Sequence, residues 1–245
     1  MMKLVKLTLV AISLLATAQI ANAQSAKFSG FNVNVSTGFE QDSVTNTNFT
    51  AWIPDQGTVP FSNGGNSTSG TAPLVLGAGY NFALTDKYLL GVKVNYYALS
   101  NTTNTISPND GGSILGLSYP VNVSYKISNR WNLILSPAYT LDETKLVYLN
   151  LGYSREQVQA TYSPVFLGGK LTSNNANLNG YILGLGYRQN LTSQIYAFGE
   201  ANYMNYNQGS LSGTGSGTIV SGPSKVNSSV GSNAMNFLIG IGYQF

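Results

Sequence analysis

The sequence of 245 residues contains no histidine and no cysteine, and only 9% of its residues are charged. Without cysteine, the chain can form neither disulfide bonds nor thiolate metal sites. Without histidine, it lacks the side chain that most often acts as a general base near neutral pH. The charged fraction lies well below the ~25% typical of globular proteins, so the composition is unusual for a soluble domain.

Long apolar runs are missing after residue 23, so no later stretch predicts a membrane-spanning helix. The first 23 residues combine a basic start, an apolar segment at 7–18 and an A-x-A cleavage site at Ala21 and Ala23. That apolar segment is too short to span a bilayer as a helix. We therefore expect a cleaved signal peptide over residues 1–23 and one domain over residues 24–245.

The remaining chain alternates between apolar residues and small or polar ones. Over residues 30–39, apolar residues and one threonine occupy the odd positions, and glycine, asparagine and serine occupy the even positions. Residues 74–81 and 90–97 follow a similar pattern. Such alternation is typical of the strands of a membrane barrel, which turn an apolar face to lipid and a polar face to the lumen.

Three segments share a local pattern that indicates hairpins. Residues 77–87, 136–145 and 184–194 each contain a small-x-small-Tyr strand end, a short polar turn and a new alternating strand. We interpret them as periplasmic hairpins of an all-β, antiparallel, up-and-down transmembrane barrel with eight strands. The expected strands are 28–39, 73–84, 87–99, 129–141, 145–156, 178–188, 194–206 and 235–245. The expected long extracellular loops are 40–72, 100–128, 157–177 and 207–234.

A barrel of ten strands is the alternative. Residues 113–127 alternate as well, and residues 158–166 do so weakly. Pro120 favours a role outside the membrane for the first of these segments, because proline cannot donate to a central strand ladder. In the eight-stranded model, residues 100–128 are partly β-structured and lengthen a hairpin above the membrane.

Aromatic residues on the expected lipid-facing side fall into two groups, as expected for belts at the two membrane interfaces. The expected outer belt contains Phe39, Tyr96, Trp131, Tyr153, Tyr181, Tyr203 and Phe237. The expected inner belt contains Tyr80, Tyr139, Tyr187 and Tyr243.

The end of the chain carries the most specific pattern. Aromatic and branched residues alternate up to the terminal carboxylate: Phe237, Ile239, Ile241, Tyr243 and Phe245. This ending resembles the signal that outer-membrane barrels present to the insertion machinery, an exposed strand edge that templates pairing.

The mature chain resembles the OmpA/OmpX-like and opacity-like (porin-related) superfamily of small outer-membrane β-barrels. The resemblance is carried by 127–153, in which SPAYTLDETKLVYLNLGY resembles the central hairpin of the opacity-like group, and by 180–205 and 236–245. It implies a location in the outer membrane of a Gram-negative cell envelope. The implied partners are outer-membrane lipid and lipopolysaccharide, with periplasmic chaperones and the barrel-insertion machinery during biogenesis. It implies no single activity.

Enzymatic activity is not expected. Outer-membrane phospholipases, deacylases and omptin-like proteases resemble one another in using a catalytic histidine, which this chain lacks. Asp142 and Glu143 are the only adjacent acidic pair, and they occupy an expected solvated turn. Glu40, Asp55 and Asp110 are scattered over expected loops, so we expect neither a metal site nor a cofactor. No basic run suggests nucleic acid.

Charge on the inward face suggests a polar network in the lumen. Lys93 and Glu200 both fall on that face, and a lone charge there is costly unless it is paired or hydrated. We hypothesise that Glu200 meets Lys93 or, as the alternative, Arg188, in a network that includes Asn95 and Asn202. The network is either a structural plug or a gate. Side chains usually fill an eight-stranded interior, which favours the plug.

The loops give a second candidate site. Phe49, Trp52 and Phe61 lie in the expected loop 40–72. They either contact a host or cell-surface ligand or pack over the barrel mouth. Residues 207–234 are rich in glycine and serine and are interpreted as a flexible spacer. The sequence thus predicts a non-enzymatic, envelope-structural and surface-displayed barrel, with a narrow porin-like channel for ions or small solutes as the alternative.

Overall fold

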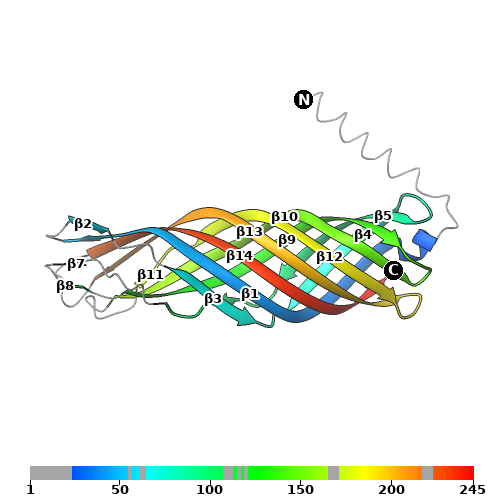
Figure 1. The fold of residues 1–245 in the computed structure, drawn as a ribbon, viewed down its shortest axis with the longest axis horizontal. Coiled ribbons are helices and arrows are strands. Elements are labelled where there is room, and N and C mark those ends of the chain that lie inside the picture. The colour runs from blue at the N-terminus through cyan, green and yellow to red at the C-terminus, as the bar shows by residue number, and fades with distance from the viewer. Residues whose placement is uncertain are drawn as a thin grey trace, which may run out of the picture.

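The computed structural model describes residues 24–54, 57–60, 65–106, 113–114, 117–118, 121–164, 171–216 and 223–245. Eight long or medium strands form the body of the molecule (Figure 1). They are β1 (Gly30–Ile53), β4 (Val75–Ala83), β5 (Tyr88–Tyr97), β9 (Val121–Thr140), β10 (Lys145–Pro164), β12 (Ala176–Asn190), β13 (Ile195–Ser216) and β14 (Pro223–Gln244). The shorter elements are η1 (Gln24–Phe28), β2 (Gly57–Pro60), β3 (Asn66–Thr71), β6 (Asn101–Thr102), β7 (Ser113–Ile114), β8 (Leu117–Ser118) and β11 (Leu171–Thr172).

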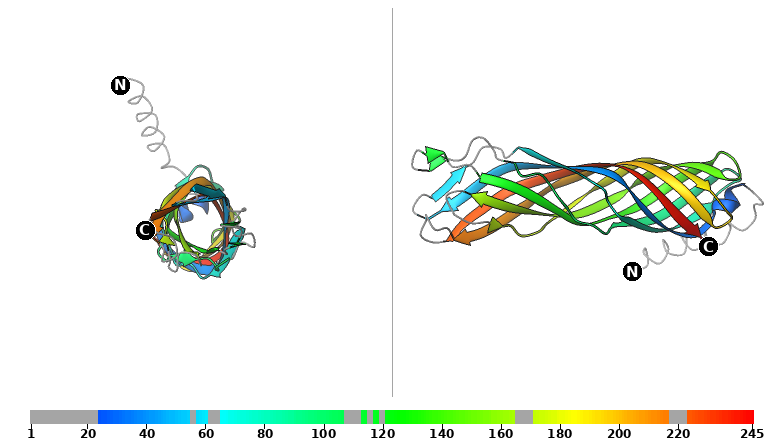
Figure 2. Two further views of the ribbon diagram at one scale, coloured as in Figure 1. Left: turned by 90° about the vertical axis from the view of Figure 1, so that its left-hand side faces the viewer. Right: turned by 90° about the horizontal axis from the view of Figure 1, so that it is seen from below.

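The eight strands close into one antiparallel ring. Each pairs with the next along the chain, in the order β1, β4, β5, β9, β10, β12, β13 and β14, and β14 returns to pair with β1. The view along the long axis shows this closure (Figure 2). The predicted eight-stranded up-and-down barrel is therefore confirmed, and the ten-stranded alternative is wrong.

The alternation of the sequence places apolar side chains on the outside of the ring. On β14, Ile239 and Ile241 are 70% and 59% exposed, while Leu238 between β13 and β1 is buried. Comparable outward rows occur on every strand of the ring, for example Leu133 with Leu135. An apolar exterior of this size is stable only against lipid.

Aromatic residues form the outer border of this apolar surface. Phe39 on β1 lies opposite Phe237 on β14 in the strand register. Tyr153 lies opposite Tyr181, and its ring centroid is 5.4 Å from that of Trp131. These contacts join neighbouring strands at one level, which is the level that the sequence predicts for the outer interface.

Beyond this belt the strands continue and the two faces of the sheet exchange character. We call the continuing part the outer extension; it consists of residues 40–53 of β1, 121–130 of β9, 155–164 of β10, 176–179 of β12, 204–216 of β13 and 223–234 of β14. Its interior is packed with buried apolar residues: Val44, Tyr125, Val158, Tyr162, Leu178, Leu211, Val226 and Val230. Its outer face carries polar residues such as Gln41, Gln157 and Asn233. This part of the barrel thus has the hydrophobic core of a water-soluble β-protein.

The outer extension corrects the predicted loops. Residues 40–53, 158–164, 207–216 and 223–234 are strand, so the boundaries drawn for three long loops were wrong. The interpretation of residues 207–234 as a flexible spacer is also wrong over its described part. Inward Leu211 and Val226 alternate with glycine and serine, and this pattern forms a strand as soon as a partner covers the apolar face. Residues 100–128 are partly β-structured, as expected, because β6 pairs with β9 above the belt, with Asn101 opposite Ile127.

Short turns and the N-terminal segment close the opposite end. The turns at 84–87, 141–144 and 191–194 lie at the end where η1 and the C-terminus also lie (Figure 1). The backbone N–H of Ser25 in η1 donates to the carbonyl oxygen of Asp86 at 3.1 Å, and Phe28 is fully buried. In the part of the chain that the structure describes, no helix is long and apolar enough to cross a membrane.

Candidate functional site in the barrel interior

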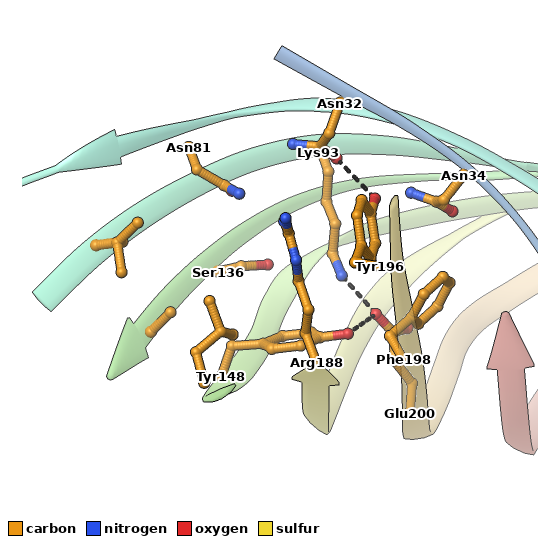
Figure 3. A pocket seen from close by; sticks show the side chains of 13 residues that line it. Asn32, Asn34, Asn81, Lys93, Ser136, Tyr148, Arg188, Tyr196, Phe198 and Glu200 are labelled. Carbon is orange, nitrogen blue, oxygen red and sulfur yellow. Dashed lines mark hydrogen bonds and ion pairs between the residues drawn. The ribbon is translucent and has the colours of Figure 1, made fainter. Parts of the chain in front are cut away.

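The inward charges of β5 and β13 meet in the middle of the barrel. Lys93 Nζ lies 2.6 Å from Glu200 Oε1, and the two side chains are 15% and 3% exposed. The hydroxyl of Tyr148 donates to the same oxygen at 2.8 Å (Figure 3). Asn202 Nδ2 donates to Oε2 at 3.0 Å. We call Lys93 and Glu200 the lower pair. Both carboxylate oxygens are bound, so the negative charge is compensated inside the protein.

Arg188 is not the partner of Glu200. Its Nε donates to Asn190 Oδ1 at 3.1 Å, and its Nη2 donates to the side-chain oxygen of Gln244. The guanidinium carbon lies 3.7 Å from the centre of the Tyr196 ring. Glu200 is therefore paired with Lys93, and Arg188 binds Asn190 and Gln244 nearer to the end of the barrel that carries the short turns.

A chain of amides leads from the lower pair toward the outer belt. Asn202 Nδ2 donates to Asn236 Oδ1 at 3.2 Å, and Asn236 Nδ2 donates to Glu40 Oε2 at 3.0 Å. From the side, Asn150 Nδ2 donates to Asn202 Oδ1 at 2.9 Å. These residues come from β13, β14, β1 and β10, so the chain connects four strands across the lumen.

The amide chain ends in a second charged group at the level of the outer belt. Arg130 lies 2.7 Å from Glu40, 2.6 Å from Asp42 and 2.7 Å from Glu156. All four side chains are at most 4% exposed. We call these four residues the upper cluster. Its three carboxylates depend on a single guanidinium, so the arginine is its central structural element.

The upper cluster was not predicted from the sequence. Glu40 was expected in a loop, and no role was predicted for Arg130 or Glu156. The signal was present, however, because Glu40 and Asp42 continue the inward positions of the first strand. The same parity holds for the other two members. For Glu40 and Asp42 the error came from ending the first strand at Phe39, whereas Arg130 and Glu156 lie inside the predicted strands 129–141 and 145–156 and their inward parity was overlooked.

The other predicted residues lie in several places. Asn95 is buried on β5, two positions after Lys93, and its Oδ1 has no hydrogen-bond partner among the described residues. Trp52 lies near the tip of β1 and is 41% exposed. Phe49 belongs to β1, but its side chain lies outside the described part, as do Phe61 and the cleavage-site alanines Ala21 and Ala23. The residues of the C-terminal pattern lie on β14 or at its end, with Phe237, Ile239, Ile241 and Phe245 outward and exposed.

Little space is left around the lower pair. A cavity of about 50 Å³ is lined by Lys93, Glu200, Arg188, Asn32, Asn34, Asn81, Ser136, Tyr148 and Tyr196, together with four apolar residues (Figure 3). This volume holds one or two molecules of the size of water. Toward the outside, the upper cluster and then the apolar interior of the outer extension fill the barrel.

Comparisons with known proteins agree with this geometry at the level of the fold. No family model matches the chain, and no curated protein matches it. Among solved structures, the outer membrane protease OmpT from Escherichia coli has a TM-score of 0.53 at 11% identity, covering 88% of this chain and 97% of that chain. OprG from Pseudomonas aeruginosa has a TM-score of 0.45 at 15% identity, covering 89% and 97%. Ail from Yersinia pestis has a TM-score of 0.39 at 14% identity, covering 88% and 99%.

The ring closure, the apolar exterior and the likeness to OmpT define the class of the protein. It has the fold of the small outer-membrane β-barrels, as the resemblance in the sequence implied. Its location is the outer membrane. At 11% identity the likeness shows the fold alone, so the activity of the solved protease says nothing about this chain.

Proposed function

We propose that the protein is a non-enzymatic scaffold of the outer membrane that stabilises the envelope and displays its outer extension at the cell surface. The observation that carries this proposal is the filling of the interior. Charged and amide side chains occupy the lumen within the membrane, and an apolar core occupies it above the belt. A barrel whose interior is filled both within the membrane and above the belt can act as a rigid support for the surface that it displays at its outer end.

The interior chemistry supports a structural role over catalysis. Each carboxylate of the upper cluster is bound to Arg130, and Glu200 is bound to Lys93. A general acid or base must reach a substrate proton, and none of these groups is exposed to a substrate. We therefore propose that these charges hold strands together.

Conductance in planar bilayers tests the filled interior. We expect the refolded barrel to give no stable current steps, because ions would have to pass the lower pair and the apolar core. The Glu200→Ala variant tests the gate alternative, since it removes the partner of Lys93. Silence of both proteins supports the plug. Uniform steps in the wild type that increase in the variant would establish the narrow channel instead.

Display by the outer extension is tested at its tip. The hairpin of β1 and β2 pairs Trp52 with Thr58 and carries an exposed aromatic ring. We propose that this tip contacts a host or cell-surface ligand. Cells displaying a variant with residues 50–60 replaced by a short turn should bind host cells less than cells displaying the wild type. The single change Trp52→Ala separates the ring from the hairpin. Equal binding by all three would remove the case for this tip.

Biogenesis is the remaining part of the proposal. We propose that residues 1–23 are removed at Ala23 and that Phe245, with the outward residues of β14, is read by the insertion machinery. Insertion in vitro should then slow when Phe245 is deleted, with the substitution Lys225→Ala, on the outward face of the same strand, as the control. The partners during insertion are periplasmic chaperones, and the partners in the mature state are lipid and lipopolysaccharide.

A further inference from the structure

We propose that the cavity between Arg188 and Lys93 binds one small monovalent anion of the size of chloride. Two basic side chains and one acidic side chain, Glu200, line this cavity. The site goes beyond the proposed scaffold role and does not depend on it.

The charges around the cavity do not balance. The remaining lining residues are asparagine, serine, tyrosine and apolar residues, which leaves one positive charge in excess. Arg188 is the uncompensated group, because it forms no ion pair with any carboxylate in the described part of the chain. A buried charge is costly unless an opposite charge accompanies it. The carboxylates of the upper cluster do not supply it, since Arg130 binds them beyond Asn202 and Asn236.

Unused hydrogen-bond donors point to the same conclusion. The guanidinium of Arg188 has five N–H groups, and only Nε and Nη2 donate hydrogen bonds within the described residues. Lys93 Nζ donates one of its three N–H groups, to Glu200. In Figure 3 the Arg188 guanidinium is directed to the side on which Asn81 and Asn32 lie. The cavity therefore combines positive charge with free donors, which is the chemistry of an anion site.

The volume restricts the size of the anion. About 50 Å³ accommodates a chloride, bromide or nitrate ion. Gluconate, a much larger sugar acid, is expected to bind there more weakly. This size difference allows a test in which ionic strength is constant and only the anion changes.

Thermal unfolding of the refolded barrel in detergent gives the first test. We expect Tm to rise by about 3 °C or more for each tenfold increase in chloride above half-saturation, with sodium gluconate keeping the ionic strength constant. The rise should disappear in Arg188→Met. It should persist in the matched control Arg155→Met, which removes an arginine from the outer face of β10. Equal Tm values in chloride and gluconate would overturn the proposal.

Crystals of the wild-type barrel grown in bromide give a second test that does not depend on a variant that folds. An anomalous peak within hydrogen-bond distance of Arg188 and Lys93 is the expected result. Full occupancy of the cavity by water without such a peak would overturn the proposal. Neither test depends on conductance or cell binding, so the anion site and the scaffold role can fail separately.

Discussion

Charged residues connect the strands at two levels along the barrel axis, the lower pair and the upper cluster. Arg130 in the upper cluster has the most charged partners. Its guanidinium is buried against Glu40, Asp42 and Glu156, and the rings of Tyr97 and Tyr206 lie 5.2 and 5.8 Å away. Three strands, β9, β1 and β10, supply the charges, and β14 joins them through Asn236, which donates to Glu40. A single substitution therefore loosens a large part of the ring.

Replacing Arg130 with methionine leaves three buried carboxylates without their cation. We expect the free energy of unfolding to fall by about 3–5 kcal/mol, as when one partner of a buried ion pair is removed. Urea unfolding of the refolded protein measures this. Adding Glu40→Gln, Asp42→Asn and Glu156→Gln to the variant should restore most of the loss, because the unpaired charges are then gone. A loss within 0.5 kcal/mol for Arg130→Met alone would mean that the cluster contributes little.

Asp142 shows a different use of a carboxylate, in a turn outside the membrane. Its pKa is lowered to about 2, chiefly because Oδ1 accepts the backbone N–H of Thr144 at 2.7 Å, and also because the Thr144 hydroxyl donates at 2.8 Å. Because the folded pKa is below the unfolded value of ~3.9, the added stability is complete above pH 4 and is lost toward pH 2.

An NMR titration of the Asp142 carboxyl carbon measures this pKa. Thr144→Val removes the hydroxyl hydrogen bond and keeps the backbone one, so we expect the pKa to rise but to stay below that of an unfolded aspartate. Lys145 lies 3.3 Å from the carboxylate, and Lys145→Met serves as the control for its weaker contribution. An unchanged pKa in Thr144→Val would show that the hydroxyl is not involved.

Within the strands, small and large inward residues are matched across neighbours. A side chain at Gly186 on β12 would overlap the ring of Tyr148 on β10, with its Cβ 2.2 Å from the ring carbon Cζ. Gly242 on β14 gives the same room to Tyr196. Glycines on the inward face thus let the aromatic rings of adjacent strands lie flat over them and reach Glu200 or Asn32.

Gly186→Val tests this matching at the level of the strand pair. The new side chain must displace Tyr148 and break its hydrogen bond to Glu200, so we expect a loss of about 1–3 kcal/mol in urea unfolding. Gly199→Ala is the matched control, because its Cβ meets only the carbonyl oxygen of Leu238 at 3.8 Å. The control should be neutral or slightly stabilising. Equal effects of the two changes would contradict the matching.

The outer extension offers a prediction about local stability. Leu211 is 1% exposed and packs into the apolar core above the belt. Leu211→Ala should weaken this core by about 2–5 kcal/mol and expose the outer hairpins to added protease, while the part within the membrane stays folded. Protease treatment of intact cells, followed by detection of the protected core, measures this. Outward Gln157→Ala should leave the cleavage rate unchanged.

The strands were predictable where lipid surrounds them and less so beyond it. Within the membrane, the alternation around Val35 or Leu133 has one interpretation, because only the apolar row can face lipid. Above the belt, the apolar row turns inward and glycine, serine and asparagine cover the outside, so the segment around Val226 has the composition of a loop. Only a partner strand identifies it as β-structure, and the sequence does not show partners.

The interior contacts were predictable in kind and less so in detail. The parity of Lys93 and Glu200 placed both in the lumen, and their opposite charges indicated a pair. The choice between Lys93 and Arg188 depends on the shear of the barrel, which sets the height of each strand relative to its neighbours. That quantity is not encoded in the alternation of any single strand. The same limit applies to Arg130, whose three partners lie 26 or more residues away.

At the scale of the whole molecule, the charge and polarity of the interior change along the barrel axis. The lower end carries an excess of positive charge at Arg188, the upper cluster carries more acids than bases, and an apolar core follows beyond it. Water and ions therefore meet a different obstacle at each level. We expect that no single substitution opens the barrel, since removing Glu200 leaves the upper cluster and the core in place. Silent bilayer recordings of Glu200→Ala and of Arg130→Met, each as a single variant, would agree with this, and steady current in either would not.

The length of β1 beyond Phe39 determines how far the protein stands off the bilayer. Fourteen residues, 40–53, at ~3.3 Å each and with a tilt of about 40°, raise the tip by about 35 Å. Because side chains fill the interior of the outer extension, it resists bending more than a hollow protrusion or one built of loops. A partner too bulky to enter the sugar layer around the barrel can still contact the tip of the outer extension. The height of the tip therefore selects partners by size before any side chain does.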